Sequence, residues 1–95
     1  MSYDVEEFFE KHRDLDYLDL INAADRAAMD AKREAHAYDA REFLTRMREI
    51  LNFLRYNNKP QFISPRDWLL CQTLAQRFVE RGILKADVLG LWNSN

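Results

Sequence analysis

Histidine is the first residue type to examine for chemistry, because acid–base catalysis and metal binding both depend on it. The chain has two histidines, His12 and His36, and neither stands at a spacing typical of metal ligands. Helical di-metal sites pair a glutamate with a histidine three residues later, whereas Glu34 and His36 are two apart and lie on different faces. One cysteine and two histidines also fall short of a zinc site. We therefore predict no bound metal and no cofactor.

The other reactive side chains favour structural roles. Asp14, Asp16 and Asp19 form an acidic cluster, but the central glycine and distal glutamate of a calcium loop are missing. Helix capping explains these aspartates. Cys71 stands in an apolar run with no histidine nearby, which predicts a buried, inert thiol. Because the chain has only two glycines, it holds no glycine-rich phosphate loop. We predict no catalytic residue and a protein that is not an enzyme.

The absence of helix breakers dominates the first 59 residues, which contain neither proline nor glycine. From about residue 15 to residue 57, apolar side chains recur at steps of three and four, the period of an amphipathic helix. We predict one all-α domain over residues 1–95, built on a long helix from about 15 to 57 with short helices beside it.

Alanine forms the middle of this apolar stripe, and its small side chain lets another helix approach closely. An unbroken helix from Asp16 to Asn57 would be about 60 Å long. A compact chain of this size has a radius of gyration of about 12 Å, so the remaining residues cannot cover such a rod. We therefore favour a homodimer. The residues predicted to self-associate are Ala24, Ala28, Ala31, Ala35 and Tyr38.

A monomeric four-helix bundle is the alternative, and it requires the long helix to break. Two break points are consistent with the sequence. One lies at residues 22–25, where Asn22 supplies a polar cap for a new helix. The other lies near residues 38–39, where Asp39 is followed by Glu42 at the spacing of a capping box. Neither contains a residue that enforces the break.

Three shorter helices are also predicted, two of them from capping signals. A capping box at the N-terminus predicts a helix over Val5–Lys11. Ser64 followed by proline predicts a helix over Pro65–Arg81, which Gly82 ends in a left-handed conformation. A last short helix is expected over Ala86–Trp92.

Charge is unevenly distributed along the chain, although its net charge is only −2. Residues 1–40 hold 11 acidic and 5 basic side chains, whereas residues 41–95 hold 5 acidic and 9 basic ones. Either the two halves neutralise each other internally or one end faces a charged partner. Aromatic and arginine side chains dominate the energetic centres of protein interfaces. The predicted partner-binding residues are Glu6, Phe9, Glu10, Asp14, Tyr56, Phe62, Arg66 and Trp92.

We predict a small helical protein–protein interaction module, such as an adaptor, inhibitor or regulatory subunit. A helical nucleic-acid-binding regulator that uses the basic C-terminal half is the alternative. Leu74–Leu84 resembles the end of the recognition helix in winged-helix regulators, but a further helix is predicted where their wing should follow. The sequence pI of about 5.6 argues against this alternative. A nucleic-acid-binding regulator would use a basic patch that combines Arg55, Lys59, Arg66, Arg77 and Arg81 with Tyr56 and Phe62.

The cellular setting follows from what the chain lacks. The N-terminus opens with acidic residues and has no apolar stretch typical of a secretory signal, so we expect none. The chain contains no run of about 18 uncharged apolar residues, so no membrane span is predicted. A single cysteine cannot form an internal disulfide, which favours a reducing compartment, and we expect the protein in the cytoplasm.

Overall fold

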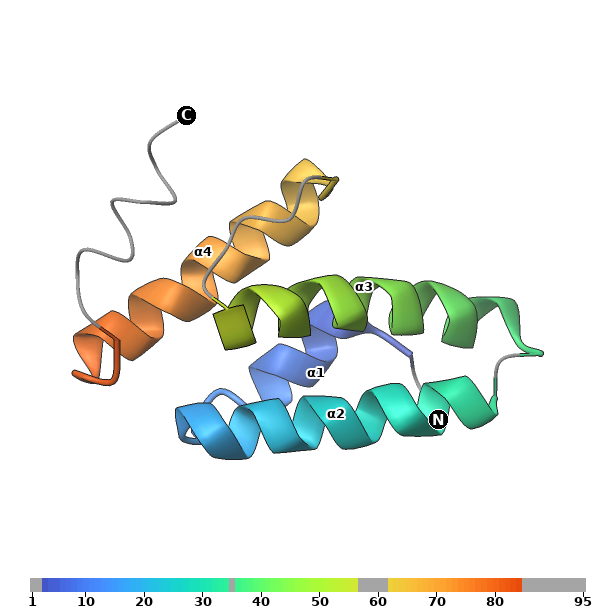
Figure 1. Cartoon of the computed structure of the whole chain (residues 1–95), viewed down its shortest axis with the longest axis horizontal. Helices are drawn as coiled ribbons and strands as arrows, with labels where there is room; N and C mark the ends of the chain where they lie inside the picture. The colour runs from blue at the N-terminus through green and yellow to red at the C-terminus, as the bar shows by residue number, and fades with distance from the viewer. Residues whose placement is uncertain (1–2, 35, 57–61, 85–95) are drawn as a thin grey trace.

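Four helices make up the part of the chain that the computed structural model describes, residues 3–34, 36–56 and 62–84, and no strand occurs there. They are α1 (Val5–Lys11), α2 (Tyr17–Arg33), α3 (Tyr38–Tyr56) and α4 (Pro65–Glu80). The helices α2 and α3 lie side by side and run in opposite directions, while α1 lies behind them and α4 crosses beside α3 (Figure 1). The prediction of an all-α fold is confirmed.

The predicted long helix is broken, because α2 ends at Arg33 and α3 begins at Tyr38. The N–H of Glu34 donates to the carbonyl oxygens of Ala31 and Asp30, and the N–H of Ala37 donates to that of Glu34. A continuous helix over residues 15–57 was therefore a wrong prediction. Residues 22–25 lie inside α2, whereas the break predicted near residues 38–39 falls at the start of α3.

Folding the long segment back on itself has a clear physical cause. The turn places the apolar stripes of α2 and α3 against each other and removes both from water, a gain that outweighs the cost of interrupting a helix. The molecule measures 40 × 27 × 18 Å, much shorter than the predicted rod. The apolar stripe that would be exposed on a continuous helix is therefore buried by other residues of the same chain.

The alanine strip is enclosed by this hairpin. Ala24 and Ala31 are fully buried and Ala28 is 8% exposed, so the predicted close helix–helix contact forms between α2 and α3 of one chain. Tyr38 is exposed, and Ala35 lies outside the described residues. Because α3 covers the strip, the strip does not require a second copy. Self-association itself stays a prediction.

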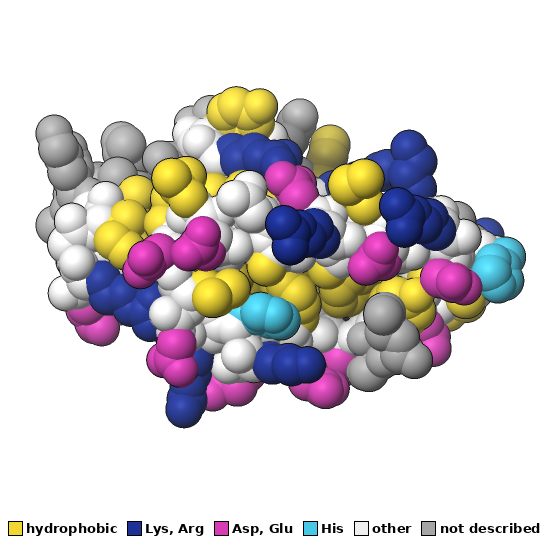
Figure 2. Space-filling view, turned by 90° about the horizontal axis from the view of Figure 1, so that it is seen from below, with side chains coloured by type: hydrophobic (Ala, Val, Ile, Leu, Met, Phe, Trp, Pro, Cys, Tyr) yellow, Lys and Arg dark blue, Asp and Glu magenta, His cyan; other side chains and the backbone are white. Residues whose placement is uncertain are grey.

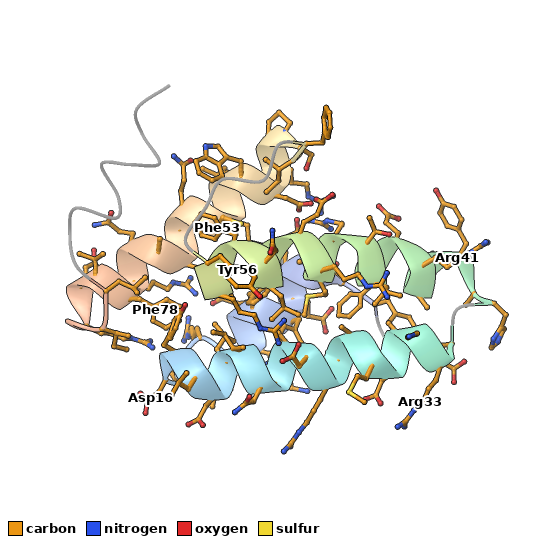
Figure 3. The ribbon with its side chains drawn as sticks, viewed as in Figure 1. Asp16, Arg33, Arg41, Phe53, Tyr56 and Phe78 are labelled. Carbon is orange, nitrogen blue, oxygen red and sulfur yellow. The ribbon has the colours of Figure 1, made fainter. Side chains whose placement is uncertain are left out.

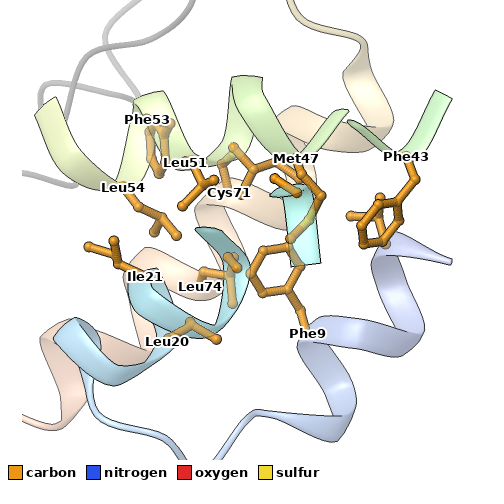
Figure 4. Packing of buried hydrophobic residues seen from close by; sticks show 14 of the residues in the cluster. Phe9, Leu20, Ile21, Phe43, Met47, Leu51, Phe53, Leu54, Cys71 and Leu74 are labelled. Carbon is orange, nitrogen blue, oxygen red and sulfur yellow. The ribbon is translucent and has the colours of Figure 1, made fainter. Parts of the chain in front are cut away.

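The hydrophobic core receives side chains from all four helices, and Figure 4 shows how they interdigitate. The ring of Phe53 on α3 meets that of Trp68 on α4 edge to face, with centroids 5.6 Å apart. At the start of α2, the hydroxyl of Tyr17 donates to the carbonyl oxygen of Leu54. The largest fully buried side chains are Phe9, Phe53, Met47, Ile50, Leu54, Leu74, Val5 and Cys71.

Local capping accounts for the ends of the shorter helices. Oδ1 of Asp4 accepts the N–H of Glu7 at 2.9 Å, and α1 has the predicted bounds. Ser64 Oγ accepts the N–H of Asp67 at 3.2 Å, and α4 ends at Glu80, one residue before the predicted end. Gly82 follows with a φ of 74°, the left-handed conformation expected of it. The helix predicted over residues 86–92 lies outside the described residues.

Candidate functional site

Arg46 on α3 joins α1 and α4 through a partly buried ion-pair network. Its Nε donates to Oδ1 of Asp67 at 2.9 Å, and its Nη2 donates to Oε1 of Glu6 at 2.8 Å. The same Glu6 oxygen lies 2.5 Å from Nε of Arg66. The Arg46 side chain is 16% exposed and Asp67 is almost completely buried. This network holds three helices together and leaves Arg46 and Asp67 with little contact with solvent.

The network shifts the pKa values of two of its members. Hydrogen bonding from Arg46 lowers the pKa of Glu6 to about 2, and hydrogen bonding to Asp67 raises the pKa of Arg46. A further pair joins Glu10 to Arg77 at 3.5 Å. Acidic residues of the N-terminal half therefore pair with basic residues of the C-terminal half. This supports internal neutralisation over a charged terminal surface as the account of the uneven charge.

The eight residues predicted to contact a partner fall into four groups. Phe9 is a core residue, 1% exposed, and a partner cannot reach it in this fold. Three form ion pairs within the chain: Glu6, Glu10 and Arg66. Three are exposed: Asp14, Tyr56 and Phe62. Trp92 lies outside the described residues.

The predicted burial of Cys71 is confirmed, whereas Asp16 occupies the N-cap of α2 without a side-chain capping hydrogen bond. His12 Nδ1 lies 2.8 Å from the carbonyl oxygen of Phe8, where it satisfies the end of α1, and Nε2 of His36 lies 3.6 Å from Glu34. Burial raises the pKa of the Cys71 thiol to about 12, which keeps it protonated. In residues 3–34, 36–56 and 62–84, no three His, Cys, Asp or Glu side chains gather as metal ligands. Within the same ranges, no helix is long and apolar enough to cross a membrane.

Two open grooves run along α2, one on each side. The α1–α2 groove has a volume of about 450 Å³, and its apolar lining includes Tyr3, Phe8 and Phe43. Figure 2 shows hydrophobic side chains as a band bordered by charged side chains of both signs. The rings in this groove pack on one another. The Tyr3 and Phe43 centroids are 5.5 Å apart, and those of Phe8 and Phe43 are 6.4 Å apart.

The α2–α3 groove, on the other side of α2, has a volume of about 420 Å³. Ala28, Leu44 and Leu51 form an apolar floor, and Met29 and Tyr56 stand at its edges. Met29 is 58% exposed and Tyr56 is 64% exposed. Figure 3 shows Tyr56 at the C-terminal end of α3, at one end of this groove.

Charge distinguishes the two grooves. The α1–α2 groove carries three acidic and two basic side chains, whereas the α2–α3 groove carries three basic side chains and one acidic one. In the α2–α3 groove, Arg55 pairs with Asp25 across the two helices. Lys32 and Arg48 are exposed, and among the described residues no carboxylate lies within ion-pairing distance of either. The α2–α3 groove therefore combines free positive charge with exposed apolar side chains.

Of the residues that line this groove, the sequence analysis named Tyr56 and Arg55 but not Met29, Lys32 or Arg48. The sequence signal that could have identified these residues is their position at the border of the apolar stripe. Met29 and Lys32 each follow a buried alanine by one residue, so each points about 100° away from the stripe and reaches its border. Such border positions become groove walls only when α2 packs against a neighbour, and the identity of that neighbour was not predicted.

Most of the basic patch predicted for nucleic acid is bound within the chain. Arg55, Arg66 and Arg77 pair with carboxylates, and the Arg81 guanidinium donates to the carbonyl oxygens of Leu15 and Arg13. The patch residue Lys59 lies outside the described residues. These arginines would have to exchange existing partners to bind phosphates.

No protein-family model, curated protein or solved structure matches this chain. What the protein does must therefore be inferred from its own residues.

Proposed function

We propose that this chain is a small helical protein–protein interaction module, an adaptor, inhibitor or regulatory subunit, that binds a partner protein through the α2–α3 groove. One observation carries the proposal. Met29 and Tyr56 are largely exposed beside an apolar floor. Large apolar and aromatic side chains that flank a concave apolar surface are typical anchors of protein interfaces.

The α2–α3 groove supports this role better than the α1–α2 groove does. In the α1–α2 groove the rings of Tyr3, Phe8 and Phe43 pack on one another and none is fully exposed. The α1–α2 groove also offers apolar surface, but its rings already contact ring partners within the chain. At the α2–α3 groove, Met29 and Tyr56 project from the surface, as side chains that anchor an interface do.

The predicted homodimer also stays a proposal. Because α3 covers Ala24, Ala28 and Ala31, a dimer would need a different interface from the predicted strip. Sedimentation equilibrium of the wild-type protein measures this directly. The cytoplasmic location is also part of the proposal, and the single buried Cys71 is consistent with it.

A matched pair of lysine substitutions tests the proposed function. Met29→Lys places a charge in the groove, whereas Leu69→Lys places the same charge on α4 at a side chain of similar exposure, 65% against 58%. Both positions are exposed, so both variants should keep wild-type stability. Affinity capture from the native cell with wild-type protein, followed by direct titration of the purified partner, measures binding.

We expect Leu69→Lys to retain the partner and Met29→Lys to weaken its affinity by about tenfold or more, the effect of losing an interface anchor. Equal affinity of the two variants for every purified partner would reject the α2–α3 groove as the binding surface.

A further inference from the structure

The shape of the α2–α3 groove matches a helix. The helices α2 and α3 lie antiparallel (Figure 1), and side chains of both helices line the groove. Ridges of side chains on a third helix pack into such a groove, as in helical bundles. From Leu44 to Tyr56 the groove follows 13 residues of α3, a length of about 18 Å or about three helical turns. The groove is therefore long enough for three or four apolar side chains on one face of a helix.

The charge of the groove selects the sign of its occupant. Its lining holds Lys32, Arg48 and Arg55 against Asp25, a net charge of +2, although the whole chain has a net charge of −2. Arg55 and Asp25 satisfy each other, while Lys32 and Arg48 have no acidic partner among the described residues. Carboxylates on a bound helix would supply the missing partners and would speed its association.

We propose that the α2–α3 groove binds an acidic amphipathic helix of another protein, an inference that rests on the proposed function. Leucine-like side chains of that helix lie on Ala28, Leu44 and Leu51, and its flanking carboxylates pair with Lys32 and Arg48. A second copy fits the groove less well, because a two-fold axis here would place one net-positive groove against another. A nucleic acid would leave the apolar floor without apolar contacts.

Synthetic peptides test the proposal directly. An acidic peptide of about 18 residues carries leucine at positions i, i+4, i+7 and i+11 and mostly glutamate elsewhere. A basic peptide keeps the leucines and replaces glutamate by lysine, and a scrambled acidic peptide breaks the apolar stripe. Fluorescence anisotropy measures the affinity of each for the full chain at about 50 mM and about 300 mM NaCl.

Two double variants change the net charge equally. Lys32→Glu with Arg48→Glu reverses the α2–α3 groove, whereas Arg26→Glu with Arg33→Glu makes the same change on other faces of α2. We expect the acidic peptide to bind about tenfold more tightly than the basic and scrambled peptides, and more weakly at the higher salt concentration. Reversal at Lys32 and Arg48 should weaken it about tenfold, and the matched reversal much less.

Three results would overturn the inference. The first is equal binding of the acidic and basic peptides, or equal effects of the two double variants. The second is a mixed-sequence single-stranded oligonucleotide that binds where the peptides do not and loses affinity when Lys32 and Arg48 are reversed. The third is a homodimer that Met29→Lys dissociates. If the peptides fail while Met29→Lys still weakens binding of a purified partner, the proposed function stands and only the acidic helix is rejected.

Discussion

Arg46 and Arg48 are two residues apart on α3, and the fold uses them in opposite ways. Arg46 faces α1 and α4, where it is 16% exposed and binds Asp67 and Glu6. Arg48 lines the α2–α3 groove, where it is exposed. A separation of two residues turns a side chain by about 200° around a helix, so the two arginines point to opposite sides. Arginine thus stabilises the fold on one face of α3 and, on the other face, carries a charge that has no acidic partner among the described residues.

The two sides of α3 differ because their helices are joined by different interactions. At the junction of α1, α3 and α4, ion pairs between distant parts of the chain satisfy Arg46 and Arg66. Between α2 and α3, buried alanines and larger apolar side chains make the contact, and charged residues remain at the border. An apolar contact needs no charges to form, so Lys32 and Arg48 at its border remain available for a partner, whereas Arg55 pairs with Asp25.

The largest expected effect is at the apolar contact. Ala31 is fully buried between α2 and α3, and Ala31→Glu would place a carboxylate there without a partner. We expect a loss of about 4 kcal/mol or more in unfolding free energy, a large share of the stability of a small domain. Urea unfolding followed by circular dichroism measures it.

Asn22→Glu adds the same charge at an exposed position of α2 and serves as the control. If Ala31→Glu keeps the helix content and stability of the wild type, and only splits a dimer, the alanine strip is an interface between copies and the contrast drawn here is wrong.

Breaking the ion-pair network should have the next largest effect. Arg46→Ala leaves the buried carboxylate of Asp67 without its cation, and we expect a loss of about 3 kcal/mol in unfolding free energy. Arg48→Ala is the matched control, because it removes an exposed arginine from the same helix and should change stability by less than about 0.5 kcal/mol. Similar losses in the two variants, measured by urea unfolding, would remove the distinction between the two faces of α3.

Acid should weaken the network, with the smallest effect of the three. Because the pKa of Glu6 is lowered to about 2 in the folded chain, its contribution is present above its unfolded pKa near 4.5 and is lost as the pH falls toward 2. The Glu6 side chain is 36% exposed, so solvent screens its charge, and we expect only about 1 kcal/mol. The difference between the unfolding free energies at pH 7 and pH 3 should be smaller by this amount in Glu6→Gln than in the wild type. An unchanged pH dependence in that variant would assign the acid sensitivity to other carboxylates.

Helix starts and the helical class could be predicted because their causes are local. Asp4 and Ser64 cap helices through hydrogen bonds to residues three positions away, and both were recognised from spacing alone. The break between α2 and α3 was predicted only as an alternative, near residues 38–39, because no proline or glycine marks it. Its cause is the burial of α2 against α3, which involves residues far apart in the sequence.

Much less of the candidate site could be predicted. The exposure of Tyr56 agrees with its selection as a surface aromatic, but Phe9 was selected on the same grounds and is buried in the core. Whether an aromatic near a helix end is exposed depends on what packs over it, and sequence spacing does not supply that information. The ion pairs of Arg46 join residues 21 and 40 positions apart, so no local pattern indicated them.

The amino-acid sequence by itself determined an all-α chain, the bounds of α1, the start of α4 and an alanine strip suited to a close helix contact. These features follow from backbone preferences and capping within a few residues. Only the tertiary structure decided that α3 of the same chain covers the strip and that Arg46 is bound while Arg48 stays free. Those outcomes depend on apolar burial and charge pairing between residues that meet only after the chain has turned back on itself.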